Sequence, residues 1–411
     1  MMIFSIVTGA LLLFFAEIIQ PHPQDLHTMY TWMNLAFERG IFQIYQWTPQ
    51  EVLSRFQEFS PNYPPLIFSL YPFAWLLNQL HLWPSWPSAG ANLFFRIPLV
   101  LGQTILLFAI YRSLTTRTPK PSFKWFLVLL CLNPAFLIAG PIWGQLNFLL
   151  WGIMALSFFK WEENKPLASA LLAALGAITK PQFVMFLPLI GFLLVKKRGP
   201  IFCVRWALTF IAAIFLYCSP FILTSGLDCL AKGYLRLAGT QYATADIGYN
   251  FWWTLFYGLP IPSLGSDLFT ISYSLIAALM ANGLVAAYGC IFCFRKTPMD
   301  WLKLATLTLL TLFCFLPGMN PQCLVFGVAF LCLSAIGIPN LRIAAITLSI
   351  VQCVNLAFNA MWTPSTRFYI GLSTGINRSI GVACFLIIMW GIYRVLKNNP
   401  VLSLLHSTNK N

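Results

Sequence analysis

Apolar stretches long enough to cross a lipid bilayer recur along the whole sequence. A spanning helix needs about 20 mainly apolar residues. Only 9% of the 411 residues are charged, whereas a soluble domain carries about a quarter. The sequence therefore predicts an all-α, polytopic transmembrane protein with a single domain over residues 1–411. Ten stretches approach or exceed the spanning length, at residues 2–19, 93–112, 123–139, 143–159, 201–223, 269–294, 301–316, 323–338, 343–361 and 380–396.

Three shorter apolar runs need a separate interpretation. Runs of about 10 to 14 residues are more often re-entrant or interfacial than spanning. Residues 167–179 and 183–195 flank the sequence Lys180-Pro181-Gln182, and we treat them as a pair of membrane segments. Residues 64–77 contain three prolines.

The distribution of basic residues decides whether residues 64–77 cross the membrane. If they do not cross, 17 of the 25 Lys and Arg residues share one side, and the other side carries eight basic and eight acidic residues. If they cross, most of the positive charge faces outward, against the positive-inside rule. We therefore predict about 12–13 membrane segments with both termini in the cytoplasm. Residues 64–77 then form a dip or a surface-lying helix.

Charge and cysteine content narrow the function classes. The formal net charge is +14, but the basic residues do not gather on one candidate face. Orientation in a membrane explains them better than nucleic-acid binding does. The eleven cysteines are scattered through apolar segments, where they are expected to pack as small apolar side chains.

This topology places the polar breaks between apolar runs on the outer side of the membrane. Two long outer loops result, at residues 20–92 and 224–267. Residues 25–40 have the apolar spacing of an amphipathic helix, with Gly40 as its stop. We expect the first loop to carry interfacial helices, and this helix to lie on the membrane surface and close over a cavity.

Asp25 follows directly after the first apolar stretch. One interpretation is an interfacial carboxylate at the start of a helix, where the helix dipole favours negative charge. The other is a general base beside the outer leaflet. A metal site with His22 and His27 is not predicted, because residues two apart point in different directions on a helix.

Lys180 stands at a break between two short apolar runs, next to a proline. A lysine at such a depth is costly unless it is paired or faces a cavity, which makes it a functional candidate. The alternative is that its side chain extends to the outer surface. A phosphate is a natural partner for its ammonium group. The nearby turn at residues 140–147 adds Trp143, Gln145 and Asn147, which equally suit a tight turn with capping side chains.

The order of short motifs resembles the GT-C superfamily of integral-membrane glycosyltransferases. The closest similarity is to bacterial polyprenyl-phosphate-mannose-dependent enzymes and to GPI mannosyltransferases, and it spans roughly residues 1–330. Two positions depart from these families: Asn147 stands where Asp is often found, and residues 318–324 read GMNPQCL where His-Glu-Arg is frequent. The matching features are Asp25 with Tyr30 and Trp32, NYPPL at 62–66, RIP at 96–98, WGQ at 143–145, TKPQ at 179–182 and YNFWW at 249–253.

The resemblance implies an inverting transfer of a hexose such as mannose on the extracytoplasmic side. The donor is a polyprenyl-phosphate sugar, and the acceptor is a hydroxyl of a glycan, a glycolipid or a protein. Asp25 is then the general base, and the two outer loops form the active-site face. No metal and no separate cofactor are expected, and a bacterial inner membrane is the expected location. The donor phosphate would be bound by Lys180, Arg96 and Arg236, and the substrates by Tyr63, Trp143, Gln145, Asn147, Gln182, Asn250, Trp253 and Gln322.

Two other function classes remain open from the sequence. A membrane transporter or a flippase for lipid-linked glycans also uses broken helices and polar groups at depth. The two halves of the sequence show no convincing repeat, and the polar features gather at the outer side. A non-catalytic partner subunit of a membrane complex would suit the two departures from the GT-C motifs.

Overall fold

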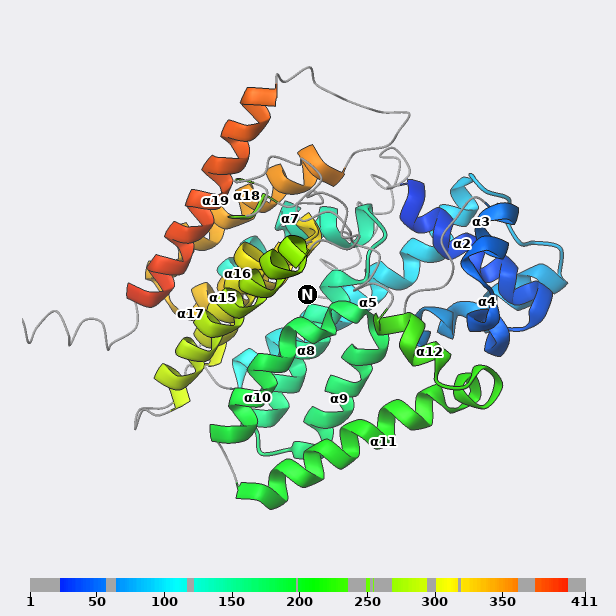
Figure 1. The fold of residues 1–411 in the computed structure, drawn as a ribbon, viewed down its shortest axis with the longest axis horizontal. Helices are drawn as coiled ribbons and strands as arrows, with labels where there is room; N and C mark the ends of the chain where they lie inside the picture. Colours follow the sequence, from blue (N-terminus) through cyan, green and yellow to red (C-terminus); the bar gives the residue numbers. More distant parts are fainter. Residues whose placement is uncertain are drawn as a thin grey trace, which may run out of the picture. The chain divides into compact units, whose positions relative to one another are not determined.

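The chain is helical throughout the part that the computed structural model describes (Figure 1). No strand occurs in these residues, so the all-helical prediction is confirmed for them. The predicted span at residues 2–19 lies outside this part. The described residues are 23–56, 64–116, 122–196, 199–235, 249–251, 254, 268–293, 301–316, 319–360 and 374–397.

Three of the described helices are long and apolar enough to cross a membrane. They are α5 (Ala89–Thr115), α11 (Gly199–Ser225) and the Arg378–Lys397 part of α19 (Thr374–Lys397). A fourth candidate is the pair Phe123–Cys131 and Pro134–Gly140, which is bent by 43° at its break. These helices fit a membrane protein. The finer count of 12–13 segments stays a prediction.

The other predicted apolar segments are also helices, with ends close to the expected positions. Proline, glycine or charged residues stand near most of these ends, as expected for residues that cannot continue an apolar helix. The remaining helices of this kind are α8 (Asn147–Glu162), α9 (Pro166–Thr179), α10 (Leu187–Lys196), α15 (Leu268–Cys293), α16 (Trp301–Phe315), α17 (Leu324–Gly337) and α18 (Arg342–Ala360).

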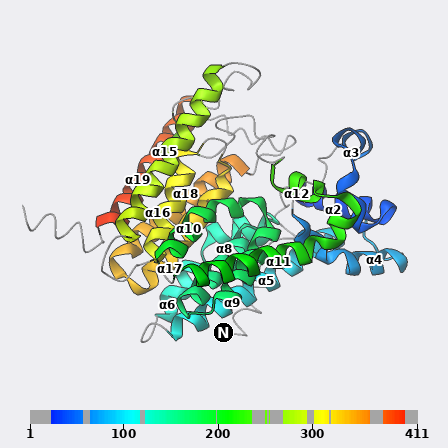
Figure 2. The ribbon, with the colours of Figure 1, turned by 60° about the horizontal axis from the view of Figure 1, so that its bottom comes forward.

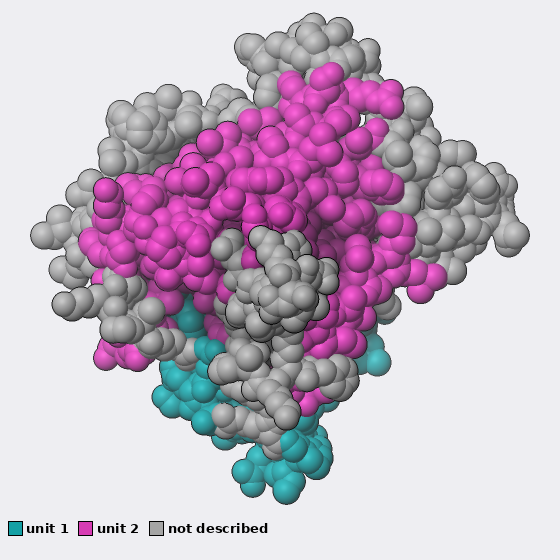
Figure 3. Space-filling view, turned by 90° about the vertical axis from the view of Figure 1, so that its left-hand side faces the viewer, with its two compact units in different colours: residues 1–110, 140–184, 199–240 teal, residues 111–139, 185–198, 241–411 magenta. Residues whose placement is uncertain are grey.

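The chain folds into two compact units, which Figure 3 distinguishes by colour. Unit 1 contains residues 1–110, 140–184 and 199–240, and unit 2 contains residues 111–139, 185–198 and 241–411. Each unit is built from several separate segments of the chain. The single functional domain over residues 1–411 stays a prediction.

Unit 2 is a bundle of apolar helices. Helices α15 to α19 pack in chain order, each against the next, and run side by side in Figures 1 and 2. Helix α10 packs against α15, where the Lys196 ammonium donates to the carbonyls of Phe292 (3.2 Å) and Cys293 (2.6 Å). These are carbonyls of the last turn of α15, which have no partner within the helix. Lys196, one of the basic residues predicted on the cytoplasmic side, therefore caps the end of α15.

Polar side chains join three helices of unit 1. The Ser157 hydroxyl on α8 donates to the Ser169 carbonyl on α9 (2.8 Å), and the Trp206 indole on α11 donates to the Ser169 hydroxyl (3.1 Å). All three residues are buried. Between apolar helices in a membrane the hydrophobic effect gives little driving force for association, because lipid tails are as apolar as the helix surfaces. Hydrogen bonds of this kind then help to hold the helices together.

Helix α2 (Pro23–Arg39) corresponds to the predicted amphipathic helix and ends at Gly40, whose φ is +86°. Its apolar side chains do not lie on the surface of the protein, however. Leu26, Met33 and Leu35 are fully buried, as is Ala36, in a core that also contains Trp32. The predicted contact of this helix with the membrane surface is therefore wrong for its apolar face. Periodicity identifies an apolar face but does not say what covers it.

Short helices complete this part of unit 1: η1 (Ile41–Gln46), α3 (Pro49–Phe56), η2 (Pro65–Leu70) and α4 (Tyr71–Gln79). Helix η1 packs on the end of α11 and on the segment that follows, α12 (Asp228–Leu230) and η6 (Ala231–Leu235). The predicted outer loops 20–92 and 224–267 thus meet in one unit.

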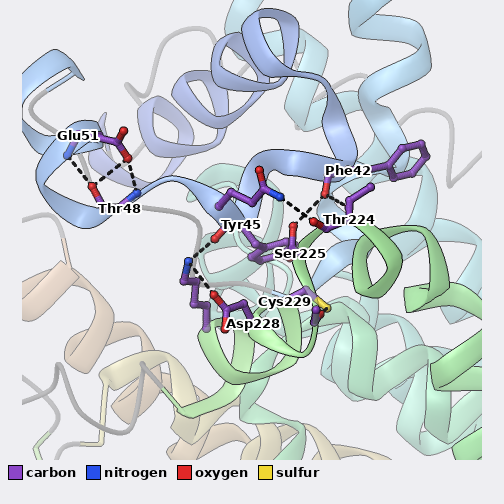
Figure 4. Close-up of polar contacts among 11 residues, drawn as sticks. Phe42, Tyr45, Thr48, Glu51, Thr224, Ser225, Asp228 and Cys229 are labelled. Atoms are coloured by element: carbon purple, nitrogen blue, oxygen red, sulfur yellow. Dashed lines mark hydrogen bonds and ion pairs between the residues drawn. The ribbon is translucent and has the colours of Figure 1, made fainter.

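Side chains from the second loop bind the carbonyl groups of η1 (Figure 4). The hydroxyls of Thr224 and Ser225 donate to the Phe42 carbonyl at 2.5 Å and 3.2 Å. The Lys232 ammonium donates to the Tyr45 carbonyl and lies 3.5 Å from the Asp228 carboxylate. Tyr45 is in the last turn of this 3₁₀ helix, where carbonyls have no partner within the helix, and the Lys232 contact satisfies its carbonyl.

Helix α3 begins with a reciprocal cap. The Thr48 amide donates to the Glu51 carboxylate (2.7 Å), and the Glu51 amide donates to the Thr48 hydroxyl (3.2 Å), as Figure 4 shows. This is the capping-box arrangement that Thr-x-x-Glu predicts. The hydrogen bonds from Thr48, with a smaller contribution from Arg39, lower the pKa of Glu51 below its ordinary value of 4.5.

The lowered pKa gives the cap a pH dependence. The ionised Glu51 carboxylate contributes fully to the free energy of unfolding above the pKa that Glu51 has in the unfolded chain. This contribution is lost as the pH falls through the lower pKa of Glu51 in the folded protein. We expect Glu51→Gln to destabilise the protein at about pH 7 and to make progressively less difference towards about pH 3. Thermal unfolding of the two proteins across this range measures it. A difference that grows on acidification would contradict the prediction.

Candidate functional site

Lys180 lies at the end of α9, where the helix is broken. Its backbone is extended (φ −158°, ψ 144°), and the 3₁₀ helix η5 (Pro181–Phe186) starts directly after it. Proline disfavours a helical conformation for the residue before it, which explains the break. The Lys180 side chain is fully buried. The alternative that it extends to the surface is therefore wrong for this structure.

The buried ammonium group of Lys180 donates a hydrogen bond to the side-chain carbonyl of Gln145. Gln145 is also buried and lies in the turn between η4 (Ile138–Ile142) and α8. The amides of Gly144 and Gln145 donate to the Gly140 carbonyl at 2.8 Å and 3.1 Å, which shapes this turn. Two motifs 35 residues apart in the sequence thus meet inside unit 1.

Helix α5 contributes two more buried polar residues to unit 1. Arg96 is 1% exposed and Gln103 is 4% exposed, and residues seven apart lie on the same face of a helix. The side-chain oxygen of Gln103 (Oε1) lies 2.9 Å from the position that a β-carbon on Gly140 would take. Gln103 therefore packs against the start of the turn that carries Gln145. Sequence reasoning missed Gln103, although a glutamine inside an apolar span is itself a signal.

Asp25 belongs to the first turn of α2, but its side chain lies outside the described part of the structure. The next residue, Leu26, packs on the turn at Gly144. A β-carbon on Gly144 would lie 2.4 Å from the Leu26 side chain. The backbone of the predicted base is therefore close to the turn that binds Lys180.

Gly144 makes this close approach possible. Its φ of +86° favours glycine, and its missing β-carbon leaves room for Leu26. We expect Gly144→Ala to lower the free energy of unfolding by about 2–5 kcal/mol, from backbone strain and overpacking together. Denaturation of the detergent-solubilised protein measures the effect.

Gly40→Ala is the matched control, because Gly40 has the same φ and no atom within 4 Å of a new β-carbon. It should show the backbone contribution alone. In the Gly144→Ala protein, the second change Leu26→Ala should recover the overpacking contribution. Equal effects of Gly144→Ala and Gly40→Ala would contradict the close packing of α2 on the turn.

Three other predicted substrate residues of unit 1 are near Gln145 or Lys180 in sequence. Trp143 and Asn147 are buried on either side of the Gly144-Gln145 turn. Gln182 is half-buried, and its side-chain oxygen is buried without a hydrogen-bond partner among the described residues. Such an oxygen can accept a hydrogen bond from a hydroxyl group of a ligand or of water.

Unit 2 contains a second group of buried carboxamides. Asn250 donates to the Leu316 carbonyl (3.2 Å), directly after the end of α16. The buried Gln322 lies in η7 (Pro321–Cys323). The carboxamide of Gln352 on α18 donates to the Pro321 carbonyl (3.0 Å). One turn further, the Asn355 side chain accepts from the Tyr249 amide (3.1 Å). Sequence reasoning missed Gln352 and Asn355.

These contacts satisfy backbone groups at two breaks in the helical chain. Unpaired backbone groups are costly in an apolar protein, so buried amides at such breaks have a structural reason. They also hold the predicted residues Asn250 and Gln322 in one unit. Three predicted site residues, Tyr63, Arg236 and Trp253, lie outside the described part of the chain.

The site in unit 1 is suited to binding a ligand that carries both an anionic group and hydroxyl groups. An ammonium group and a guanidinium group are both buried in this unit, and the neutral carboxamides of Gln145 and Asn147 lie on the turn beside Lys180. Buried cations attract anions more strongly than exposed ones do. Among the described residues, no group of three or more His, Cys, Asp or Glu side chains could hold a metal ion. No protein-family model and no curated protein matches this sequence.

Proposed function

We propose that the protein transfers a hexose from a polyprenyl-phosphate donor to an acceptor hydroxyl, on the outer side of a bacterial inner membrane. The main support is the buried Lys180–Gln145 pair, because it puts a cation beside the turn that packs on the start of α2. A phosphate group neutralises such a cation, and a lipid-linked phosphate reaches it from the bilayer. About a dozen membrane crossings complete the proposed topology.

The chemistry is a displacement at the anomeric carbon of the donor sugar. The acceptor oxygen forms a bond to this carbon as the bond to the phosphate oxygen breaks, which inverts the configuration. Asp25 accepts the proton of the acceptor hydroxyl. The leaving polyprenyl phosphate carries the electron pair of the broken bond, and Lys180 stabilises the charge that develops on its oxygens. Arg96 and Arg236 are further candidates for phosphate contacts.

The neutral side chains bind substrate hydroxyl groups. Carboxamides donate and accept hydrogen bonds, as neighbouring sugar hydroxyls require. Aromatic residues stack on the apolar face of a sugar ring. The proposed residues are Gln145, Asn147, Gln182, Asn250 and Gln322, with Tyr63, Trp143 and Trp253.

The proposal is tested with the full-length protein in lipid nanodiscs. Labelled polyprenyl-phosphate mannose is supplied with a membrane extract from cells that lack the protein, which contains the unmodified acceptor. We expect the label to move to an acceptor, with release of one polyprenyl phosphate for each sugar transferred. A nucleotide sugar should not replace the donor.

A transporter or flippase is the second candidate, supported by the break between Phe123–Cys131 and Pro134–Gly140, where Asn133 is buried. Such broken helices also occur at transport sites. Proteoliposomes distinguish the two functions. Movement of the labelled lipid-linked sugar across the bilayer, with no transfer to any acceptor, would contradict the glycosyltransferase proposal.

A further inference from the structure

Helix α4 exposes a continuous apolar face. Phe73 is 66% exposed, Leu76 51% and Leu80 56%, and these residues recur at the spacing that puts side chains on one side of a helix. Trp75 (47%) on the adjoining side of the helix and Leu82 (64%) after its end are exposed as well. Exposed clusters of large apolar side chains indicate a contact with a protein partner or with a membrane.

The opposite side of α4 is fixed to the protein. Ala74 is fully buried, the Tyr71 hydroxyl donates to the Ala36 carbonyl of α2 (3.3 Å), and the Tyr71 ring packs on Phe37 (5.9 Å between centroids). The rotation of α4 about its own axis is therefore set by α2. The exposed face cannot turn inward without breaking these contacts.

Lipid, rather than water or a protein partner, is the occupant that the neighbouring helix favours. Helix α5 starts ten residues after the end of α4 and is one of the three described helices that are able to span a membrane. It exposes Leu101, Ile105 and Phe108 along one stripe. Ile97 (41% exposed) brings the stripe into the first third of α5, and α4 precedes this helix in the chain.

The length of α4 determines how it meets the bilayer. Nine residues of α-helix extend about 14 Å, well short of the roughly 30 Å hydrocarbon core. The helix also carries Trp75 on its exposed side, and tryptophan is enriched at the level of the lipid headgroups. An apolar helix of this length fits the boundary between headgroups and acyl chains.

We propose that the exposed face of α4, with Leu80 and Leu82, inserts into the membrane leaflet at which α5 begins. The apolar face of α2 that sequence periodicity assigned to the membrane surface is buried. Most of α4 belongs to residues 64–77, which the sequence predicts as a dip or a surface-lying helix, and in this proposal α4 lies between α2 and the lipid. Because α2 is attached to α4, this contact sets the depth of α2 relative to the headgroups. The inference does not depend on sugar transfer.

The test uses a photo-crosslinking residue, benzoylphenylalanine, placed at Leu76 of the full chain in nanodiscs of phosphatidylethanolamine and phosphatidylglycerol. The side chain of Leu76 is largely exposed, so the replacement leaves the fold intact. After irradiation we expect the intact mass to increase by that of one phospholipid. The same residue at Ile105 on α5 is the positive control and should give the same shift.

Gln50 on α3 is the matched negative control, because it is exposed and α3 lies on the other side of α2 from α4 in Figures 1 and 2. No lipid adduct is expected there. A lipid adduct at Ile105 but not at Leu76 would overturn the proposal, as would equal lipid adducts at Leu76 and Gln50. Exclusive crosslinks from Leu76 to another protein chain would assign the surface to a partner instead.

Discussion

Asp25→Asn is expected to lower the rate of sugar transfer by about 10²- to 10⁴-fold, the usual contribution of a general base. Asparagine has nearly the same shape as aspartate but cannot accept the proton of the acceptor hydroxyl. The donor should still bind, because its phosphate contacts come from other residues. We therefore expect kcat to fall with little change in the affinity for the donor, measured by transfer kinetics and by equilibrium binding of the lipid-linked sugar.

Asp228→Asn is the control for this experiment. Asp228 also lies in a predicted outer loop of unit 1, but its carboxylate is exposed and pairs with Lys232. Its replacement should leave transfer unchanged. Full activity of the Asp25→Asn protein would remove the general-base role, and Asp25 would then be a carboxylate that only stabilises the start of α2.

Much of the helical organisation follows from the lengths of the apolar runs. The predicted segments 201–223 and 269–294 correspond to α11 and α15 with ends that differ by a few residues. A run of apolar residues must satisfy its backbone groups internally in lipid, and only a helix does this within one segment. Local sequence therefore predicts these elements well.

The contacts between elements are much harder to derive from the sequence. The apolar face of α2 was predicted correctly, but the prediction that this face contacts the membrane was wrong, because it packs against other parts of the protein. Burial against protein and burial against lipid require the same residue types. Likewise, the TKPQ and WGQ motifs each indicate a polar break, while the hydrogen bond between Lys180 and Gln145 depends on how α8 and α9 pack. Single residues in a motif do not encode this packing.

The carboxamides of α18 illustrate a third limit. Gln352 and Asn355 stand three apart in a mainly apolar helix, and nothing in their neighbourhood in the sequence marks a site. Their partners, the Pro321 carbonyl and the Tyr249 amide, are 31 and 106 residues away. A buried amide is recognisable in sequence as a polar residue at depth, but the backbone group it satisfies is visible only in the fold.

Lys180→Met should reduce sugar transfer by about 10²- to 10³-fold, comparable to the loss of one group that stabilises charge in a transition state. The methionine side chain is similar in length and fits an apolar surrounding, but it cannot stabilise the leaving phosphate. Lys180→Arg should restore little activity, because the planar guanidinium does not place its charge where the ammonium group lies. Transfer kinetics with the lipid-linked donor measure both variants.

Lys165→Met is the matched control, since Lys165 is an exposed lysine of the same unit that pairs with Glu163 (2.9 Å). It should transfer sugar at the normal rate. A double-mutant cycle then separates catalysis from packing: if Gln145 acts by orienting Lys180, Gln145→Leu should lower transfer in the natural protein but add little in the Lys180→Met protein. Fully additive losses would mean that the two residues act independently. Unimpaired transfer by Lys180→Met would leave the buried ammonium group a structural role only, and the proposed phosphate site would lose its main support.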